Sequence, residues 1–229
     1  MLTLHSYPGL FGVADNNPFG LKVFAAMRLG GLAFRHVHIF DASRAPRGQL
    51  PYLTDGAETV GDSEAIIAHL QAHRGLALDH ALTPAQRALR HLAVRTLDDL
   101  YWVMSYSRWQ DERYWPQFRD AVLAQHPSVT PEAMEVARAC NAQRYHYQGI
   151  GRFAPEQAYA RGIGDLEAIG AQLPAEGFVF GTVPCSLDAA IYGFVANIRF
   201  YPIGTPLRAW VLGHPALLRH CDAIHAAIA

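Results

Sequence analysis

The sequence predicts an α/β domain followed by an all-helical domain, and three observations support this. The first third of the chain alternates short apolar runs, bounded by turn residues, with helical patterns. Residues 75–80 then form a break with little periodicity. Beyond it, the chain reads as a series of helices opened by proline. We therefore assign residues 1–76 to the α/β domain, 77–82 to a linker and 83–229 to the helical domain.

The α/β domain has the element order strand, helix, strand, loop, strand, strand, helix. Residues 2–7 form the first predicted strand and residues 34–40 the second. Between them, Asn17 is a good N-cap for a helix that begins at Pro18 and ends at Gly30-Gly31. Because a helix connects these two strands, we expect them to be parallel.

Residues 48–67 concentrate the turn signals of this domain. Asp55-Gly56 predicts a hairpin turn between two short strands. Pro51 lies just before the first of these strands, which fits a turn or an edge position. A cis Leu50-Pro51 bond is one way to build that turn.

Asp62 and Ser63 lie where the N-cap of the following helix is expected. The free NH groups of a helix N-terminus, together with a hydroxyl, attract a carboxylate. Two interpretations remain open at this point. Either the pair only caps the helix, or it forms an anion pocket with the turn at Pro51.

Two helix starts in the second domain carry reciprocal capping patterns. Thr83 caps the first helix, and Gln86 completes a capping box. Cys185 precedes Asp188 by three residues in the same kind of arrangement, although cysteine is a poor cap. We expect Cys185 to be a structural thiol. Further helices are expected to begin near Pro116, Pro131 and Pro155.

Composition narrows the possible function classes. The 229 residues are 51% hydrophobic with a formal net charge of -1, which suits a compact soluble protein and gives no nucleic-acid footprint. No apolar run has the length of a membrane span and the N-terminus lacks a secretory pattern, so we expect a cytoplasmic protein. The three cysteines fit reduced thiols. The twelve histidines, His36 and His38 included, show no metal-ligand spacing, so no metal site is predicted.

Two stretches carry a resemblance to a known family. The run from Gln49 to Ile66, with Leu50-Pro51 and Asp62-Ser63 within it, resembles the glutathione-binding half of the thioredoxin-like domain of glutathione transferases. Residues 178–190 resemble their C-terminal-domain pattern, in which a Ser or Thr stands three residues before a buried Asp. The resemblance implies the glutathione transferase fold, an α/β thioredoxin-like domain followed by an all-α helical domain.

The same resemblance implies which residues hold glutathione. In the family, a cis-proline loop pairs its backbone with the tripeptide, and an acidic residue and a Ser hold the γ-glutamyl end. Arg44 or Arg47 could meet the glycyl carboxylate by bidentate pairing, with a solvated loop charge as the alternative for either. The expected glutathione-binding residues are Arg47, Gln49, Leu50, Pro51, Asp62 and Ser63.

Catalysis requires a thiolate near neutral pH, whereas a free thiol has a pKa of about 8.5. Family members face the sulfur with a Tyr at the end of the first strand, a Ser at the first helix, or a Cys. Here Asn17 stands at the sulfur-facing position of the Cys-Pro-x-Cys motif of thioredoxin-like proteins, which disfavours a mixed disulfide. We expect the amide of Asn17 and the helix N-terminus to stabilise the thiolate. Tyr7 and Ser6 are the alternatives for the activating group. A non-catalytic role for Asn17, as a simple N-cap of the helix, also stays open.

An aromatic-rich stretch follows at residues 101–115. Packing in the core is the commoner role of such residues. In a glutathione transferase this helix faces the cleft between the domains, so Tyr101, Tyr106 and Trp109 are candidates for the wall that binds the electrophile. The partner of the neighbouring Arg108 is left open by the sequence.

The resemblance implies a glutathione S-transferase that conjugates its co-substrate glutathione to a small hydrophobic electrophile, as in detoxification. It also implies a homodimer, the commonest soluble oligomer. Residues 17–22, 28–32, 100–102 and 105–109 look like the metaxin and failed-axon-connections branch of the superfamily, including its bacterial members. That branch implies the alternative function, a non-catalytic glutathione transferase-like module for binding or interaction.

Overall fold

A four-stranded mixed sheet forms the core of the N-terminal part. The computed structural model describes all residues, 1–229. The strand order is β2-β1-β3-β4, with β1 and β2 parallel and the other pairs antiparallel, so the prediction of a parallel first pair is confirmed. The strands are β1 (Leu2–Ser6), β2 (Phe34–His38), β3 (Tyr52–Asp55) and β4 (Glu58–Gly61).

The first two strands are shorter than predicted. Ser6 pairs with His38 at the end of the parallel ladder, so β2 has no partner strand beyond His38. Pro8, two residues after the end of β1, has no NH to offer such a ladder. The predicted turns are present, because Gly56 between β3 and β4 has a φ of 62° and the Leu50-Pro51 bond is cis.

Both helices of the N-terminal part begin at the predicted caps. The side chain of Asn17 accepts a hydrogen bond from the Phe19 NH at 3.0 Å at the start of α1 (Pro18–Leu29). The side chain of Asp62 accepts from two backbone NH groups, both at 3.0 Å, at the start of α2 (Ser63–His73). Such side-chain acceptors satisfy donors that the helix itself leaves free.

The remainder of the chain is helical, as predicted, and Thr83 and Gln86 form the expected capping box. Two short 3₁₀ turns, η1 (Pro46–Gly48) and η2 (Ile150–Arg152), lie outside the α-helices. No helix combines the length and apolar character needed to cross a membrane. The helices are α3 (Pro84–Trp109), α4 (Trp115–Gln125), α5 (Pro131–Gln148), α6 (Pro155–Gly170), α7 (Ser186–Arg199), α8 (Pro206–Leu212) and α9 (Pro215–Ala227).

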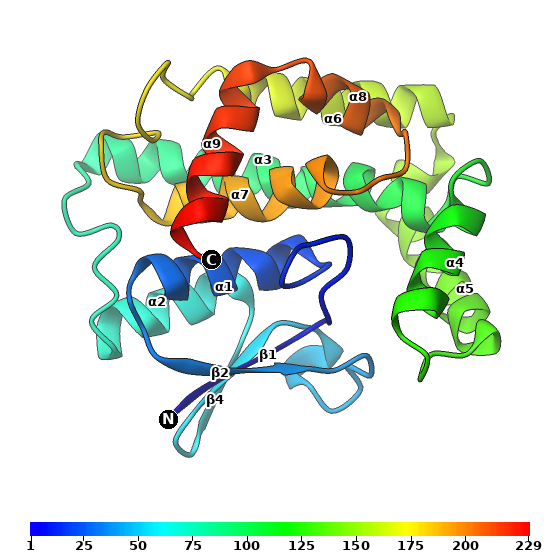
Figure 1. The fold of residues 1–229 in the computed structure, drawn as a ribbon, viewed down its shortest axis with the longest axis horizontal. Coiled ribbons are helices and arrows are strands. Elements are labelled where there is room, and N and C mark those ends of the chain that lie inside the picture. Colours follow the sequence, from blue (N-terminus) through cyan, green and yellow to red (C-terminus); the bar gives the residue numbers. More distant parts are fainter.

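Helix α1 lies between the sheet and the helical part, directly below α7 in Figure 1. The two helices approach closely because α7 carries Gly193 at the contact. A Cβ atom at that position would lie 2.6 Å from the Pro18 carbonyl oxygen and 2.9 Å from the backbone nitrogen of Lys22. The missing side chain therefore allows α1 to pack tightly on α7.

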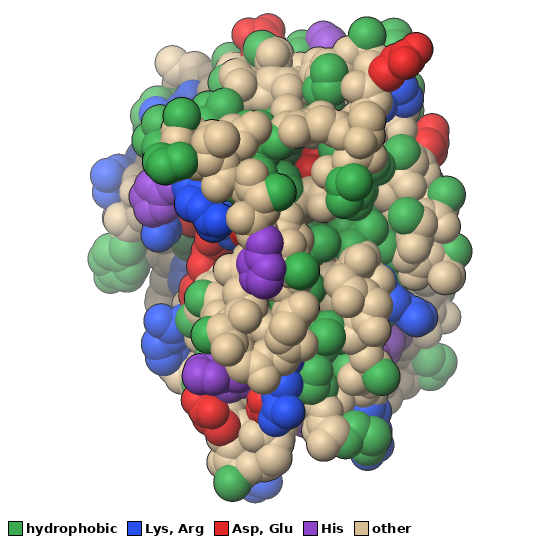
Figure 2. Space-filling view, turned by 90° about the vertical axis from the view of Figure 1, so that its left-hand side faces the viewer, with side chains coloured by type: hydrophobic (Ala, Val, Ile, Leu, Met, Phe, Trp, Pro, Cys, Tyr) green, Lys and Arg blue, Asp and Glu red, His purple; other side chains and the backbone are tan.

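Helices α4 and α5 stand apart from this stack, at the right of Figure 1. They lie beside the end of the sheet at which the loop before α1 emerges. On the face seen in Figure 2, charged side chains of both signs are scattered among apolar and uncharged ones. The three cysteines are free, with Cys185 and Cys221 buried.

Asp188 anchors the start of α7 and is fully buried. Its carboxylate accepts hydrogen bonds from the Val179 NH at 3.0 Å, the Cys185 NH at 2.8 Å and His220 Nε2 at 2.9 Å. Burial acts to raise the pKa of Asp188, but these hydrogen bonds outweigh it and hold the pKa below its usual value. The reciprocal cap predicted at this helix start is thus made by the Asp188 carboxylate and the Cys185 backbone.

Replacing this carboxylate should destabilise the fold. We expect Asp188→Ala to lower the free energy of unfolding by about 3 kcal/mol, because two backbone NH groups and an imidazole lose their buried acceptor. Chemical denaturation followed by circular dichroism measures the change. Glu135→Ala, on the exposed side of α5, is the control. A loss below about 1 kcal/mol for Asp188→Ala would contradict the anchoring role.

Candidate functional site

Two neighbouring cavities lie where the loops of the sheet meet the helical part. The first has a volume of about 430 Å³ and is bounded by η1, the starts of α1 and α2, and the middle of α3. It brings together every residue that the sequence predicts for glutathione binding. Those residues are Arg47, Gln49, Leu50, Pro51, Asp62 and Ser63.

The second cavity has a volume of about 380 Å³ and lies between α3, α4, α5 and the loop before α1. Trp109, one of the predicted electrophile-binding residues, lines it. Nine of its 17 lining residues are hydrophobic, which suits a hydrophobic ligand. They include Phe40, Phe118, Val122 and Met134.

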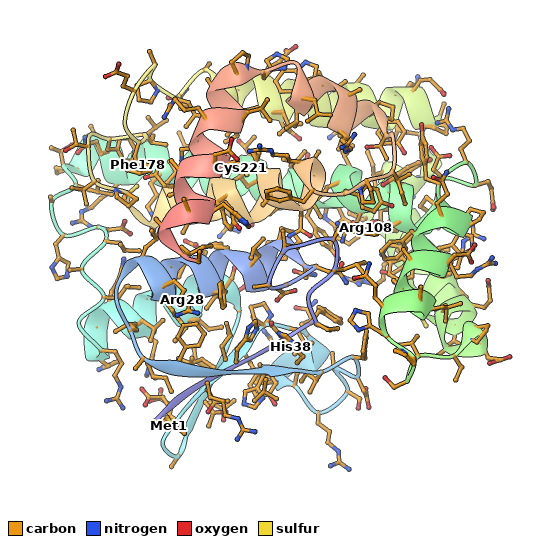
Figure 3. All side chains as sticks on the ribbon, viewed as in Figure 1. Met1, Arg28, His38, Arg108, Phe178 and Cys221 are labelled. Carbon is orange, nitrogen blue, oxygen red and sulfur yellow. The ribbon has the colours of Figure 1, made fainter.

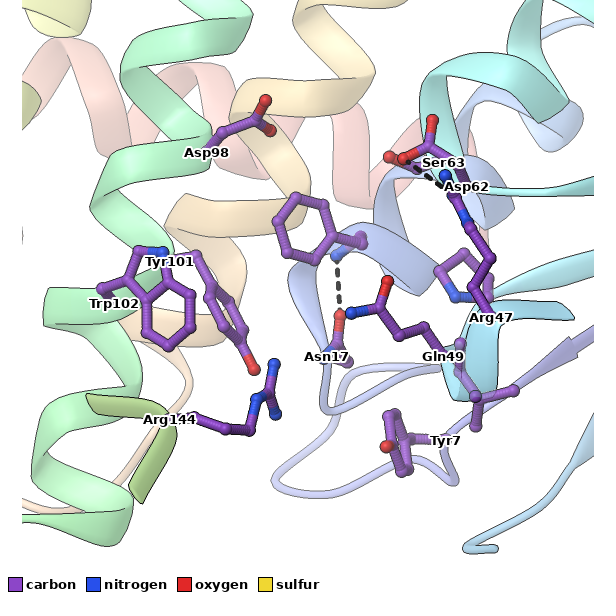
Figure 4. A pocket seen from close by; sticks show the side chains of 14 residues that line it. Tyr7, Asn17, Arg47, Gln49, Asp62, Ser63, Asp98, Tyr101, Trp102 and Arg144 are labelled. Atoms are coloured by element: carbon purple, nitrogen blue, oxygen red, sulfur yellow. Dashed lines mark hydrogen bonds and ion pairs between the residues drawn. The ribbon is translucent and has the colours of Figure 1, made fainter. Parts of the chain in front are cut away.

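Four residues line both cavities and form the junction between them: Tyr7, Asn17, Tyr101 and Arg144. Figure 4 shows Tyr101 and Arg144 on the helical side of this space, and Tyr7, Asn17 and Gln49 on the other. The junction thus combines two phenols, one amide and one guanidinium. A ligand that extends from the first cavity into the second must pass these groups.

The first cavity is bordered by two residues with left-handed backbone conformation. Asp62 has a φ of 83° and Arg47 a φ of 59°, values that are unfavourable for residues with a Cβ. Their side chains approach each other, with Arg47 Nη2 and an Asp62 oxygen 3.5 Å apart. Backbone strain of this kind is commonly found at ligand sites.

Ser63 connects the first cavity to a buried chain of charges. Its hydroxyl accepts a hydrogen bond from Lys22 Nζ at 3.3 Å, and Lys22 forms an ion pair with Glu64. Arg90 of α3 also binds Glu64, at 2.9 Å. Because the Ser63 oxygen accepts from Lys22, the hydroxyl proton is left to donate toward the cavity.

Asn17 both caps α1 and lines the junction. Its Oδ1 is taken by the Phe19 NH, while its side-chain NH₂ makes no hydrogen bond within the protein. Pro18 has no NH, so the first turn of α1 offers few backbone donors. The NH₂ group of Asn17 is therefore the main donor that the start of α1 presents to the junction.

The loop that carries Asn17 is fixed by the buried guanidinium of Arg108, which is 5% exposed. Arg108 donates to the Asn16 carbonyl at 2.6 Å and to Asn16 Oδ1 at 2.7 Å. Its other amino group donates to the carbonyl and the side chain of Asn197, at 3.3 and 3.2 Å. Figure 3 shows Arg108 at the level where this loop meets the helical part.

Asp15 lies beneath the same loop, completely buried. Its Oδ1 accepts the Asn17 NH at 2.7 Å, whereas its Oδ2 has no hydrogen-bond partner. Gly20 makes room for it, because a Cβ there would lie 1.7 Å from Oδ2. Burial raises the pKa of Asp15 to about 8, against the smaller opposing effects of the Ser6 hydroxyl, the Asn17 NH and Arg108. Near neutral pH this carboxyl is therefore largely protonated.

Comparison of the sequence with known proteins shows the family to which the chain belongs. Residues 18–114 match the family model of the glutathione S-transferase N-terminal domain, and residues 162–224 match that of the C-terminal domain. A curated relative, the isoprene-epoxide glutathione S-transferase of Rhodococcus sp. (strain AD45), is 30% identical over 98% of both chains. The chain belongs to the glutathione S-transferase family. The predicted family and fold class are thereby confirmed.

Two further similarities define the breadth of this relationship. The Failed axon connections protein of Drosophila melanogaster is 25% identical over 89% of this chain, which spans 52% of that protein's length. A glutathione S-transferase of Methylobacterium radiotolerans, solved with glutathione sulfonate, has the same fold with a TM-score of 0.64 at 17% identity. The match covers 99% of this chain and 92% of that one.

Ser6, one of the alternatives for thiol activation, lies outside both cavities. It is fully buried, and its hydroxyl lies 2.7 Å from His36 Nε2. Side chains alternate along β1, so Ser6 faces the core while the next residue, Tyr7, reaches the junction. Burial raises the pKa of Tyr7, with Tyr101 adding to the effect, which keeps the Tyr7 hydroxyl protonated as a hydrogen-bond donor.

Tyr106, predicted to line the electrophile site, also lies elsewhere. It is five positions after Tyr101 on α3, which turns it by about 140° around the helix axis. The ring packs edge-on against Tyr145 and Tyr159, and its hydroxyl donates to the Phe153 carbonyl at 3.4 Å. Arg44 is exposed and lines neither cavity.

Several residues at the cavities were not assigned there from the sequence. Those on α3 lie on the same helix face as Tyr101, three or four residues apart along the sequence, and the cavity residues of α5 have the same spacing. That periodicity could have indicated the α3 residues, since one residue on that face was already a candidate. The cavity residues that were missed include Asp98, Trp102, Ser105, Arg108, Asn141 and Arg144.

The buried carboxyl of Asp15 should make stability pH-dependent. The unfolded chain loses this proton near pH 4 and the folded protein near pH 8, so the folded state binds the additional proton between them. The free energy of unfolding contributed by this group therefore falls as pH rises, by about 1.4 kcal/mol per pH unit around pH 5 to 7. We expect Asp15→Asn to remove this slope in urea denaturation, and Asp120→Asn, at an exposed site on α4, to retain it. An unchanged slope in Asp15→Asn would mean that Asp15 is ionised in the folded protein.

Proposed function

We propose that this protein is a glutathione transferase that binds glutathione in the first cavity and conjugates it to a small hydrophobic electrophile in the second. The observation that carries the proposal is the shared junction. A polar cavity with an acidic residue and a Ser at a helix N-terminus adjoins a more apolar one, and Tyr7, Asn17, Tyr101 and Arg144 line both. Two reactants held in this way meet at one point.

Glutathione fits the first cavity by charge. The Asp62 carboxylate suits the α-amino group of the γ-glutamyl end, and the Ser63 hydroxyl and the N-terminus of α2 suit its carboxylate. The extended backbone at Leu50-Pro51 offers pairing to the peptide, and Arg47 offers a cation at the rim, 62% exposed. The solved Methylobacterium radiotolerans relative with glutathione sulfonate supports glutathione as the ligand.

The electrophile is best sought among small apolar molecules. The apolar lining of the second cavity supports this class, and the name of the Rhodococcus relative supports an epoxide as one test compound. We propose Asn17 as the thiolate-stabilising donor and Tyr7 as the alternative.

The second candidate function is a non-catalytic binding module. The similarity to Failed axon connections and the absence of Cys or Ser at the start of α1 favour it. Glutathione binding without conjugation of either an aryl halide or an epoxide would support this candidate over the first.

Glutathione affinity should depend on the charge of Asp62. We expect Asp62→Asn to weaken glutathione binding about tenfold in isothermal titration calorimetry, because a charge-assisted contact to the α-amino group is lost. The cap of α2 is retained, since Asn is as good an N-cap as Asp. Asp120→Asn is the control. Equal affinity in wild type and Asp62→Asn would exclude Asp62 from the binding site.

Thiol activation should depend on the NH₂ group of Asn17. Asn17→Asp keeps the oxygen that caps α1 but exchanges the donor for a negative charge beside the sulfur. We expect kcat/KM for chlorodinitrobenzene to fall at least about tenfold with thermal stability nearly unchanged. Asn17→Ala should also lose activity, together with the cap. If Asn17→Asp retains wild-type kcat/KM, the Tyr7 hydroxyl becomes the activating group, and Tyr7→Phe tests it.

A further inference from the structure

The junction between the cavities contains one positive charge, on Arg144. Tyr7, Asn17 and Tyr101, which line both cavities with it, bear hydroxyl and amide groups. Figure 4 shows the Arg144 side chain extending from α5 beside Tyr101, toward the space in front of Asn17. The helical part therefore contributes a cation at the point where the two cavities meet.

Arg144 is free to bind an anion there. It forms no ion pair, and its polar contact is with Asn141 Oδ1 at 3.1 Å, while its guanidinium lies 5.6 Å from the centre of the Trp102 ring. The other two arginines do not lie at the junction: Arg47 lines only the first cavity, and Arg108 lines only the second and is bound to Asn16 and Asn197. Stacking on Trp102 positions the planar guanidinium without using up its donors.

The remaining charged groups around the junction come from three elements. Asp98 of α3 lies in the first cavity, Asp41 after β2 lies in the second, and Asp62 at α2 is paired with Arg47. Asp98 is paired with Arg95, whose Nη1 lies 3.0 Å from its Oδ2, and desolvation raises the pKa of Asp98. Asp41 is engaged with Ser43, through hydrogen bonds to its NH and hydroxyl at 2.9 Å each. No carboxylate therefore neutralises Arg144.

We propose that Arg144 is a catalytic residue that stabilises the negative charge on the sulfur of glutathione at the junction, an inference that rests on the proposed function. Asn17 donates to the sulfur from the α1 side, and Arg144 adds a full charge from α5. A cation within about 4 to 6 Å lowers the pKa of an anionic group by one or more units. Thiol activation in this protein is thereby divided between the two parts of the fold.

The chemical step is a balanced substitution. The bound thiol releases its proton to water, and the thiolate forms a sulfur–carbon bond with the electrophile. The bond from that carbon to its leaving group breaks, and the leaving group keeps the electron pair. With chlorodinitrobenzene the leaving group is chloride; with an epoxide it is the ring oxygen, which then takes a proton from water.

The test is the pKa of the bound glutathione thiol, read from the ultraviolet absorbance of the thiolate as a function of pH. We expect Arg144→Gln to raise this pKa by about one unit and Arg144→Lys to restore part of the shift. Arg119→Gln, on α4 and bound to Asp120, lines neither cavity and should leave the pKa unchanged. An unchanged pKa in Arg144→Gln overturns the assignment.

A second measurement separates a sulfur contact from a carboxylate contact. S-methylglutathione has both carboxylates but no ionisable thiol. We expect Arg144→Gln to bind it within about twofold of wild type, while glutathione at neutral pH binds several-fold more weakly. An equal loss for both ligands would assign Arg144 to a carboxylate and overturn the proposal. If the wild-type protein binds neither glutathione nor S-methylglutathione, the proposed function fails. If the wild-type protein binds glutathione and lowers the pKa of its thiol, but Arg144→Gln does not change that pKa, only the role of Arg144 is overturned.

Discussion

The position of the loop before α1 depends on one buried cation, the guanidinium of Arg108. Removing this group from water is costly, and its hydrogen bonds to Asn16 and Asn197 offset that cost. One partner belongs to the loop and the other to α7, so the ion joins the N-terminal part to the helical part. Asn17 follows directly in the chain, and its place at the junction is a consequence of this contact. Gly193 contributes by allowing α1 and α7 to approach closely.

Local signals predicted much of the fold because they arise from short-range hydrogen bonds. Caps at Asn17, Asp62 and Thr83 join residues two or three positions apart, and a single sequence displays such spacings directly. The contact between Arg108 and Asn16 joins residues 92 positions apart. Nothing in the local sequence specifies that pairing, so its role emerged only when the helices were placed in space. The assignment of residues 1–76 and 83–229 to separate domains stays a prediction.

The residues of the two cavities also differed in how far the sequence could predict them. The residues predicted for glutathione are nearly contiguous in sequence, between Arg47 and Ser63, so the resemblance could identify them as a group, and they do surround one cavity. The wall of the second cavity is assembled from separate helices, where rotation about a helix axis decides which side chain faces inward. Tyr101 and Tyr106 share α3 but face different neighbours. Arg144 carried no signal of its own, because its helix α5 is largely exposed and varied in composition.

This division has a consequence for the proposed chemistry. The groups assigned to glutathione are held by the sheet, by the strained backbone at Asp62 and by the Lys22–Glu64–Arg90 charges. The second cavity is lined in part by residues of α4 and α5, and these two helices stand apart from the main stack of helices. Substitutions there can alter the electrophile without disturbing the glutathione anchors, because the two sets of contacts share only the junction. Asn17 and Arg144 lie at that junction, so a change in either would affect the reaction of every electrophile that the cavity admits.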